Sequence, residues 1–338
     1  MRCLKCPAQA QVEVRRHHAA FCGPHYLEFF ETQVRRAIAR WKMLTPQDRV
    51  LVAVSGGKDS LSLWEVLSRL GYSTTGLYIH LGIGEYSDLS QEKCQRFASE
   101  RGLPLLIVDL RRHYGLGLPE LARRLHRVPC SGCGLSKRYI LNKEALDRGF
   151  TTVATGHNLD DEAATLLGNI LHWQEGYLAR QSPALEASHH RLVKRVKPLY
   201  LLSEKETASY ALLRRIDYIA DECPHAEGAL SLLYKDALNR IELQSPGAKG
   251  QFVSGFLDKA HARFQGADQE AGSLRECLTC GYPTTGDVCN FCRMWDRALK
   301  QPQKVPVPAS MPPLPNPGIL VDGVPEPQVD GGEQATGY

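Results

Sequence analysis

The chain has 338 residues, 43% of them hydrophobic, so it can bury a sizeable core and is longer than a typical single domain. Its 41 lysines and arginines stand against 37 aspartates and glutamates, and this net charge of +4 excludes a strongly polybasic protein. The first residues lack the apolar core of a secretory signal, and no apolar run reaches the ~20 residues that cross a bilayer. We therefore expect a cytoplasmic protein with no membrane partner.

The first element in the chain is a compact cluster of cysteines and histidines. Its four candidate ligands form two pairs, each with two residues between the members: Cys3, Cys6, Cys22 and His25. Four such ligands fill the tetrahedral coordination of zinc and leave no open position, which predicts a structural zinc module over residues 1–28. His17 and His18 compete for the fourth place, but only His25 has the knuckle spacing from Cys22. A chance grouping of free thiols is the alternative.

A basic helical pattern follows over residues 26–43, and strands and helices then alternate. Apolar, β-prone runs occupy residues 50–54, 76–81, 104–110 and 151–155, and a helical pattern follows each of them. Near-continuous apolar strands separated by helices are typical of a parallel sheet with helices on both faces, so we predict an α/β domain over residues 29–265. A further helix is expected to begin at Ser203, with Glu206 at capping-box spacing, and we interpret it as a packing helix.

The first predicted strand runs directly into a glycine-containing loop, which a helical pattern follows. The loop consists of Ser55, Gly56, Gly57, Lys58, Asp59 and Ser60. The glycines permit a tight turn of converging N–H groups at the positive end of the next helix, which predicts a phosphate site. Lys58 adds positive charge, and Asp59 is placed to hold Mg2+ with ATP or to help close the turn. Because ligands bind at the carboxyl ends of parallel strands, we expect Ala53, Ile79 and Gly156 to line the adenosine pocket.

This loop is not a Walker A loop, because the spacer and the second Gly-Lys of that motif are absent. It resembles instead the PP-loop of the ATP pyrophosphatases, which implies cleavage of ATP to AMP and pyrophosphate. The alternative is a strand-to-helix turn that needs glycine only for its backbone. The strand, loop and helix are all present in the order that the motif requires, which favours the phosphate site.

A second cysteine cluster lies near the end of the chain. Its candidate ligands form two CxxC pairs: Cys277, Cys280, Cys289 and Cys292. Paired CxxC spacing is highly specific and predicts a structural zinc ribbon over residues 270–298, with free thiols as the alternative. Residues 300–338 are rich in proline and glycine and poor in aromatics, which predicts a disordered tail.

Three cysteines of the α/β region belong to neither cluster: Cys130, Cys133 and Cys223. They could hold a metal centre that keeps one coordination position free, such as an iron-sulfur cubane. One alternative is a catalytic disulfide or persulfide at Cys130 and Cys133, and another is a third structural zinc completed by His225. Spacing alone does not choose between metal and redox chemistry. Cys94 lies in a helical pattern and is expected to be a packing thiol.

Taken together, these motifs resemble the TtuA-type family of tRNA 2-thiouridine synthetases over residues 1–297. The resemblance is carried by both zinc motifs, the loop at 54–60, and the segments 130–138, 154–162 and 222–224. It implies that ATP adenylates the C2 oxygen of a tRNA uridine and that sulfur then displaces AMP. It also implies a [4Fe-4S] cluster on Cys130, Cys133 and Cys223, whose free iron carries the sulfur, and so favours metal over a redox pair.

The same resemblance implies roles for individual polar residues. Lys137, one helical turn after Cys133, is expected to act in catalysis and to contribute to the ATP site. Asp161 is expected to be catalytic and Asp160 structural, although a simple helix cap is the alternative for either aspartate.

The substrate and partners follow from the resemblance too. Segments 82–87 and 289–295 look more like enzymes that act on 5-methyluridine 54 in the T loop, which take sulfur from a ubiquitin-like carrier protein thiocarboxylate and form homodimers. The alternatives are thiolation of wobble uridine 34, another PP-loop adenylation such as cytidine thiolation or amidation, and a zinc-ribbon RNA-binding protein with a vestigial ATP site. Retention of Lys58, Asp59 and Ser60 speaks against a vestigial site.

Overall fold

The computed structural model describes residues 1–126, 129–225, 230–265 and 274–300, and these belong to one compact unit. The proline-rich segment at 301–338, where we expect a disordered tail, lies outside the described residues. None of the helices in the described part of the chain is both long and apolar enough to cross a membrane.

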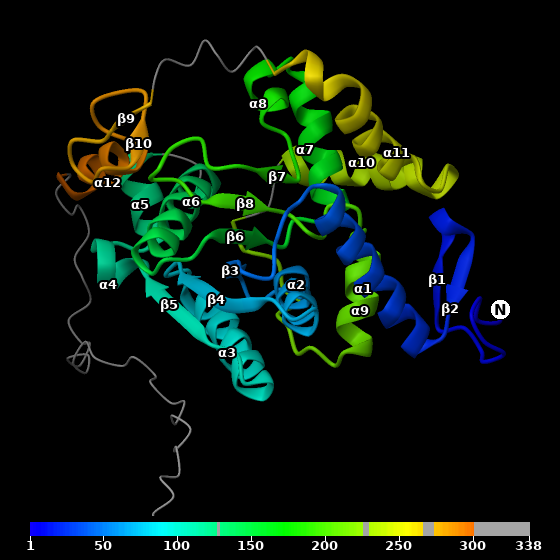
Figure 1. The fold of residues 1–338 in the computed structure, drawn as a ribbon. Helices are drawn as coiled ribbons and strands as arrows, with labels where there is room; N and C mark the ends of the chain where they lie inside the picture. Colours follow the sequence, from blue (N-terminus) through cyan, green and yellow to red (C-terminus); the bar gives the residue numbers. More distant parts are fainter. Residues whose placement is uncertain (127–128, 226–229, 266–273, 301–338) are drawn as a thin grey trace, which may run out of the picture. The chain divides into compact units, whose positions relative to one another are not determined.

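A six-stranded sheet forms the centre of the unit, in the order β5-β4-β3-β6-β8-β7 (Figure 1). Its strands are β3 (Arg49–Val54), β4 (Ser73–His80), β5 (Leu105–Asp109), β6 (Thr152–Thr155), β7 (Ala184–Leu185) and β8 (Lys194–Val196). The first five strands in this order run parallel, in agreement with the prediction, whereas the edge strand β7 runs antiparallel to β8. The sheet is therefore mixed. The sequence did not predict the antiparallel edge, because β7 and β8 are too short to give a periodic apolar signal.

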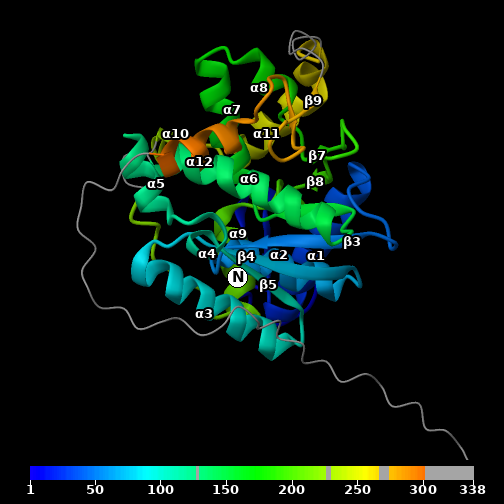
Figure 2. The same ribbon diagram turned by 90° about the vertical axis from the view of Figure 1, so that its left-hand side faces the viewer.

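The helices lie on both faces of this sheet (Figure 2). The helices are α1 (Gly23–Arg40), α2 (Lys58–Arg69), α3 (Gly84–Arg101), α4 (Leu110–Tyr114), α5 (Leu118–Leu125), α6 (Pro129–Asp147), α7 (Leu159–Leu171), α8 (Glu175–Ala179), α9 (Glu204–Leu213), α10 (Leu230–Gln244), α11 (Ala248–Gly255) and α12 (Asn290–Lys300). Side chains alternate along β3: Val50, Val52 and Val54 join a core with α1, α2, α3, α7 and α9, while Leu51 joins a core with α5, α6 and α12. Two apolar cores thus sandwich the sheet.

The strand order reverses its direction between β3 and β6. The chain builds outward from β3 through β4 to β5 and then returns to the other side of β3 with β6. Ligands of open α/β sheets bind at such a switch point, beyond the carboxyl ends of the strands. The loop that follows β3 and the loop that follows β6 meet there.

Two small hairpins accompany this domain. One is β1 (Val12–Val14) with β2 (Ala19–Phe21), and the other is β9 (Arg275–Glu276) with β10 (Pro283–Thr284). The first leads into α1 and the second into α12, so each cysteine cluster combines a hairpin with the start of a helix. The division into separate domains at residues 28 and 270 remains a prediction.

Candidate functional site: a phosphate loop beside three cysteines

The loop after β3 is a tight turn that requires glycine at two close contacts. Gly56 has φ +78°, and a Cβ atom there would lie 2.7 Å from the carbonyl oxygen of Ser90 in α3. Gly156, the first residue after β6, would place a Cβ 2.9 Å from the backbone nitrogen of Ser60. The N-terminus of α2 is therefore clamped between α3 and the loop after β6, with its free N–H groups directed to the switch point.

The side chain of Ser60 closes this loop. Its hydroxyl oxygen accepts from the backbone N–H of Ser55 over 3.0 Å and donates to the carbonyl oxygen of Gly57 over 3.0 Å. The hydroxyl of Ser55 lies 3.2 Å from that of Ser60. Local hydrogen bonds thus hold the anion-binding turn in shape before any ligand arrives.

Five charged side chains of alternating sign form a line at the loop, and neutral Asn158 closes this line into a ring. Lys58 Nζ lies 3.2 Å from Asp59 Oδ2 and 2.7 Å from Glu204 Oε1. Lys235 Nζ lies 3.7 Å from the other oxygen of Glu204 and 2.6 Å from Asp161 Oδ1. The ring joins α2, α9, α10 and α7, so four separate segments supply one site.

Asn158 closes the ring between the two aspartates. Its side chain donates to Asp59 over 3.1 Å and accepts from the backbone N–H groups of Asp160 and Asp161, as the N-cap of α7. The carboxylate of Asp161 accepts from the backbone N–H of Asn158 over 3.1 Å. Asn158 and Asp161 therefore form the reciprocal hydrogen bonds of a capping box, with Asp161 at its N3 position. Asp161 therefore combines a cap with a carboxylate at the switch point.

The environment shifts the acid–base behaviour of these groups in different directions. Burial raises the pKa of Asp59 despite the opposing influence of Lys58 and Asn158. Burial also acts to raise the pKa of Asp161, but the ammonium of Lys235 outweighs it and lowers that pKa overall. Burial opposes the charge on Lys58 and Lys235, yet their carboxylate partners raise the pKa of both. Near neutral pH both lysines and Asp161 therefore carry charge.

Asp160 has a different environment from Asp161. It is only 4% exposed, and its carboxylate lies 2.5 Å from Lys249 Nζ of α11 and accepts from the backbone N–H of Glu204 over 2.8 Å. Lys249 in turn donates to Asn239 over 2.7 Å. These contacts tie α7, α9, α10 and α11 together underneath the charged ring.

The segment that carries Cys223 is attached directly to the phosphate loop. The backbone N–H of Ile219 donates to the carbonyl oxygen of Gly56 over 2.9 Å. Asp217, two residues earlier, forms ion pairs with Lys93 and Arg96 of α3. The chain between α9 and Cys223 is thus held against the site.

The three unassigned cysteines lie near one another. Burial raises the pKa of Cys133, the positive charge of Lys137 opposes this, and Cys223 and Cys130 add to the rise. Cys130 is exposed and donates to the carbonyl oxygen of His225 over 3.2 Å, whereas Cys133 and Cys223 are half-buried. Helix α6 carries Cys130, Cys133 and Lys137, and the helical turn between Cys133 and Lys137 agrees with the prediction.

These three sulfurs are spaced differently from ligands of a single ion. In the described part of the chain they do not form a group within 4.8 Å, in contrast to the two four-ligand clusters. A cubane binds its thiolates at separate iron corners, so its ligands lie farther apart than those of one tetrahedral ion. The donor set, three accessible or half-buried thiols with the ammonium of Lys137 beside Cys133, is chemically suited to such a cluster.

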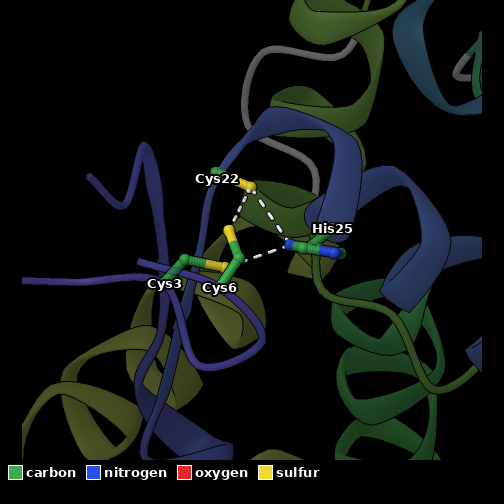
Figure 3. Close-up of side chains that lie close together, drawn as sticks. All are labelled: Cys3, Cys6, Cys22 and His25. Atoms are coloured by element: carbon green, nitrogen blue, oxygen red, sulfur yellow. Dashed lines mark hydrogen bonds between the residues drawn. The ribbon is translucent and has the colours of Figure 1, made fainter. Parts of the chain in front are cut away.

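The N-terminal cluster has the dimensions of a tetrahedral site (Figure 3). Cys6 Sγ lies 3.7 Å from Cys22 Sγ, and His25 Nδ1 lies 3.3 Å from the sulfurs of both Cys3 and Cys22. Zinc bond lengths predict about 3.8 Å between two thiolates and about 3.5 Å between a thiolate and an imidazole nitrogen. His25 belongs to this group, whereas His17 packs its ring against Phe29.

The C-terminal cluster has the same dimensions. The sulfurs of Cys280 and Cys289 lie 3.8 Å apart, and all four ligand atoms lie within 4.8 Å of one another. The backbone N–H groups of Cys289 and Cys292 donate to the sulfurs of Cys277 and Cys289 over 3.2 and 3.4 Å. Burial acts against ionisation of Cys277, but the backbone N–H groups of Cys289, Thr279 and Cys280 outweigh it and lower the pKa of Cys277 to about 6. The thiolate form that zinc needs is therefore favoured at Cys277, whereas burial raises the pKa of Cys289 and Cys292 in the metal-free cluster.

Most of the residues expected at the site meet there, and two functional candidates were missed. The loop residues, Gly156 and Asp161 come from segments that converge on the switch point, Lys137 lies beside Cys133, and Ile79 is 7% exposed and packs in the α6 core. Glu204 and Lys235 had no signal of their own, since an acid in a first helical turn and a lysine on an amphipathic helix are common features.

Comparison with known proteins agrees with this geometry. Residues 28–227 match the family model of the PP-loop domain. The chain is 58% identical to tRNA-5-methyluridine(54) 2-sulfurtransferase of Thermus thermophilus over 90% of this chain and 94% of that protein. It is 45% identical to the enzyme of the same name from Pyrococcus horikoshii, over 87% of this chain and 94% of that protein.

A solved structure provides a further comparison. The U34-tRNA thiolase NcsA from Methanococcus maripaludis, determined with its [4Fe-4S] cluster, is 25% identical and has a TM-score of 0.75. The match covers 91% of this chain and 99% of that one. The family resemblance and the PP-loop fold predicted from the sequence are thus confirmed, and the chain belongs to the PP-loop family of tRNA 2-sulfurtransferases, in the group of the 5-methyluridine(54) enzymes.

Proposed function

We propose that this chain uses ATP to convert 5-methyluridine 54 in the T loop of tRNA to its 2-thio form, releasing AMP and pyrophosphate. The observation that carries the proposal is the hydrogen bond from Ile219 to Gly56, because it joins the segment of Cys223 to the phosphate loop. The segment that leads to Cys223 therefore lies against the phosphate loop, which supports nucleotide chemistry and sulfur chemistry at neighbouring sites. The 58% identity to a 5-methyluridine(54) enzyme supports the choice of target.

The first half of the reaction activates the uridine. The C2 oxygen attacks the α-phosphorus of ATP, a new phosphorus–oxygen bond forms, and pyrophosphate leaves. The N–H groups of the loop from Ser55 to Ser60 and the ammonium of Lys58 bind the phosphates, and Asp59 holds Mg2+ with ATP. Ala53 and Gly156 flank the nucleotide at the ends of β3 and β6, and we keep Ile79 as an expected contact. Catalysis at this stage consists of positioning and charge stabilisation.

The second half replaces AMP with sulfur at C2. Cys130, Cys133 and Cys223 would hold a [4Fe-4S] cluster, which would supply the chemistry of sulfur delivery when bound. Lys137 lies beside Cys133 and offsets negative charge that develops on the adenylated uridine. Asp161, ionised and oriented by Lys235 and Asn158, receives or directs the proton that sulfur transfer releases.

The two four-ligand clusters hold zinc ions with a structural role. Cys3, Cys6, Cys22 and His25 form one, and Cys277, Cys280, Cys289 and Cys292 form the other. Each leaves no open position on a tetrahedral ion, so neither takes part in the chemistry. Each cluster links a short hairpin to the start of a helix. A hairpin this small buries too little apolar surface to hold its position without the metal.

The sulfur donor is a ubiquitin-like carrier protein with a C-terminal thiocarboxylate, and the enzyme works as a cytoplasmic homodimer. These parts of the proposal rest on the family to which the chain belongs.

Nucleoside analysis of tRNA tests the proposed function. In a strain that lacks this chain, we expect loss of 2-thio-5-methyluridine while 2-thiolated wobble uridines persist. Loss confined to position 34 would assign the wobble uridine as target, and full retention of both would exclude tRNA uridine thiolation. Purified chain should also release pyrophosphate in a tRNA-dependent manner, which a vestigial ATP site would not do.

A further inference from the structure

The carboxylate of Glu204 bridges two lysines at the phosphate loop. Its oxygens lie 2.7 Å from Lys58 Nζ and 3.7 Å from Lys235 Nζ, so each oxygen faces a different ammonium. A phosphate group presents its oxygens to two cations in the same way. The carboxylate of Glu204 therefore occupies the position, and carries the negative charge, that a phosphate group would have between the two lysines.

The net charge of the ring opposes ATP binding as it stands. Three carboxylates, Asp59, Asp161 and Glu204, surround the ammoniums of Lys58 and Lys235. Mg2+ bound with ATP can compensate Asp59, whereas Glu204 repels a phosphate and occupies the lysines that would bind it.

The backbone of Glu204 is fixed, but its side chain has room to leave. Its N–H donates to the buried carboxylate of Asp160 over 2.8 Å, and Ser203 and Glu206 form a capping box around the start of α9. The Glu204 side chain is 42% exposed, while those of Lys58 and Lys235 are 22% and 23% exposed. The carboxylate is therefore more open to solvent than either lysine, so it can turn outward while the lysines remain partly enclosed.

We propose that Glu204 is an internal anion that neutralises Lys58 and Lys235 in the ATP-free protein, and that phosphate groups of ATP displace it, so that Lys235 becomes a phosphate ligand. The inference rests on the proposed use of ATP and adds a residue of α10 and one of α9 to the site. Lys235 then contacts ATP on one side and Asp161 on the other, so phosphate binding and the orientation of the catalytic carboxylate are linked through one ammonium.

Calorimetric titration of the full chain with magnesium pyrophosphate and with a non-hydrolysable magnesium ATP analogue tests this. We expect Glu204→Gln to bind both about five-fold more tightly, equivalent to about 1 kcal/mol, because no carboxylate has to be displaced. Lys235→Met should bind them about ten-fold more weakly, since one charge-assisted phosphate contact is lost. Asp236→Asn and Lys205→Met remove matched exposed charges from α10 and α9 and should leave affinity unchanged.

Weaker binding by Glu204→Gln would overturn the displacement and make Glu204 a metal or structural ligand. Unchanged binding by Lys235→Met would restrict Lys235 to orienting Asp161. If Glu204→Gln does not fold, Glu204→Asp keeps the charge at the start of α9 but is too short to bridge both lysines, and it should also tighten binding. A wild-type chain that binds neither probe would contradict the use of ATP itself, whereas normal wild-type binding with unaffected variants would contradict only the displacement.

Discussion

The ammonium of Lys235 in α10 lies 2.6 Å from the carboxylate of Asp161 at the start of α7. The opposite oxygen of that carboxylate accepts from the backbone N–H of Asn158, so both oxygens have fixed partners. The lysine lowers the pKa of Asp161 against the influence of burial. The result is an ionised carboxylate of defined orientation beside the phosphate loop.

Replacing Asp161 should separate chemistry from folding. We expect Asp161→Asn to lower the rate of tRNA thiolation by at least about 100-fold, the scale of a lost acid–base group, while magnesium pyrophosphate still binds. The asparagine keeps the acceptor of the cap but loses the ion pair with Lys235, so the melting temperature should fall modestly without loss of the fold at assay temperature. Mass spectrometry of tRNA nucleosides measures the rate, with Asp236→Asn as the charge-matched control. Wild-type rates in Asp161→Asn would exclude a catalytic role.

Asp59 should destabilise the folded, ATP-free protein at neutral pH, because burial raises the pKa of its carboxyl. A carboxyl whose pKa is higher in the folded protein than in the unfolded chain stabilises the fold at low pH, and this contribution is lost as the pH rises through its folded-state pKa. Without ATP and Mg2+, Asp59→Asn should therefore raise the melting temperature at pH 7, and the difference should vanish at acidic pH. The same variant should bind magnesium ATP poorly. A lower melting temperature at pH 7 would contradict the prediction.

The contact between Gly156 and the start of α2 should not tolerate a side chain. The Cβ of Gly156→Ala would lie 2.9 Å from Ser60 N and 3.0 Å from Asp59 C, both backbone atoms that cannot move without shifting the helix. We expect a loss of ATP affinity of at least about ten-fold, because the loop N–H groups lose their convergence. Gly250→Ala, where nothing lies within 4 Å of the added atom, is the control for a general glycine effect. Equal affinities in the two variants would argue against the clamp.

The buried pair of Asp160 and Lys249 should dominate the stability of the helices behind the site. Both side chains are nearly inaccessible, so Lys249→Met leaves an unpaired buried charge and should lower the free energy of unfolding by about 3–5 kcal/mol. The double replacement Asp160→Asn with Lys249→Met should cost less than the two single changes together. Urea unfolding measures these values, and Lys300→Met, which breaks an exposed pair with Asp296, should cost no more than about 1 kcal/mol. Additive losses would show that the two groups are not coupled.

The C-terminal module should support the cluster site through α12. Trp295 donates to Ser136 over 3.3 Å, and the ring of Phe291 stacks on Tyr139 at 3.7 Å, so α12 packs on the helix that carries Cys133 and Lys137. We expect Cys277→Ser to lower zinc from about two to about one per chain and to reduce iron retention as well. Metal analysis of anaerobically purified protein measures both, with Thr279→Ser as the control in the same loop. Zinc loss with unchanged iron would show that the two sites are independent.

Much of this protein could be predicted from its sequence, because its signals are local. The turn from Ser55 to Ser60 depends on neighbouring residues, as do the paired spacings of both cysteine clusters and the capping box at Ser203. The strands β3 to β6 are apolar runs long enough to be recognised. The short strands β7 and β8, with two and three residues, were not foreseen because a side-chain period of two needs more residues to appear.

The tertiary structure alone decided which distant residues complete the site. Lys58 and Glu204 lie 146 positions apart in the chain, and Glu204 looked like an ordinary acid in the first turn of a packing helix. Likewise, nothing in the segment before Cys223 indicates that Ile219 pairs with Gly56. Sequence patterns report how a residue relates to its neighbours along the chain, whereas a charged ring drawn from four helices exists only once the sheet and its two cores have brought their ends together.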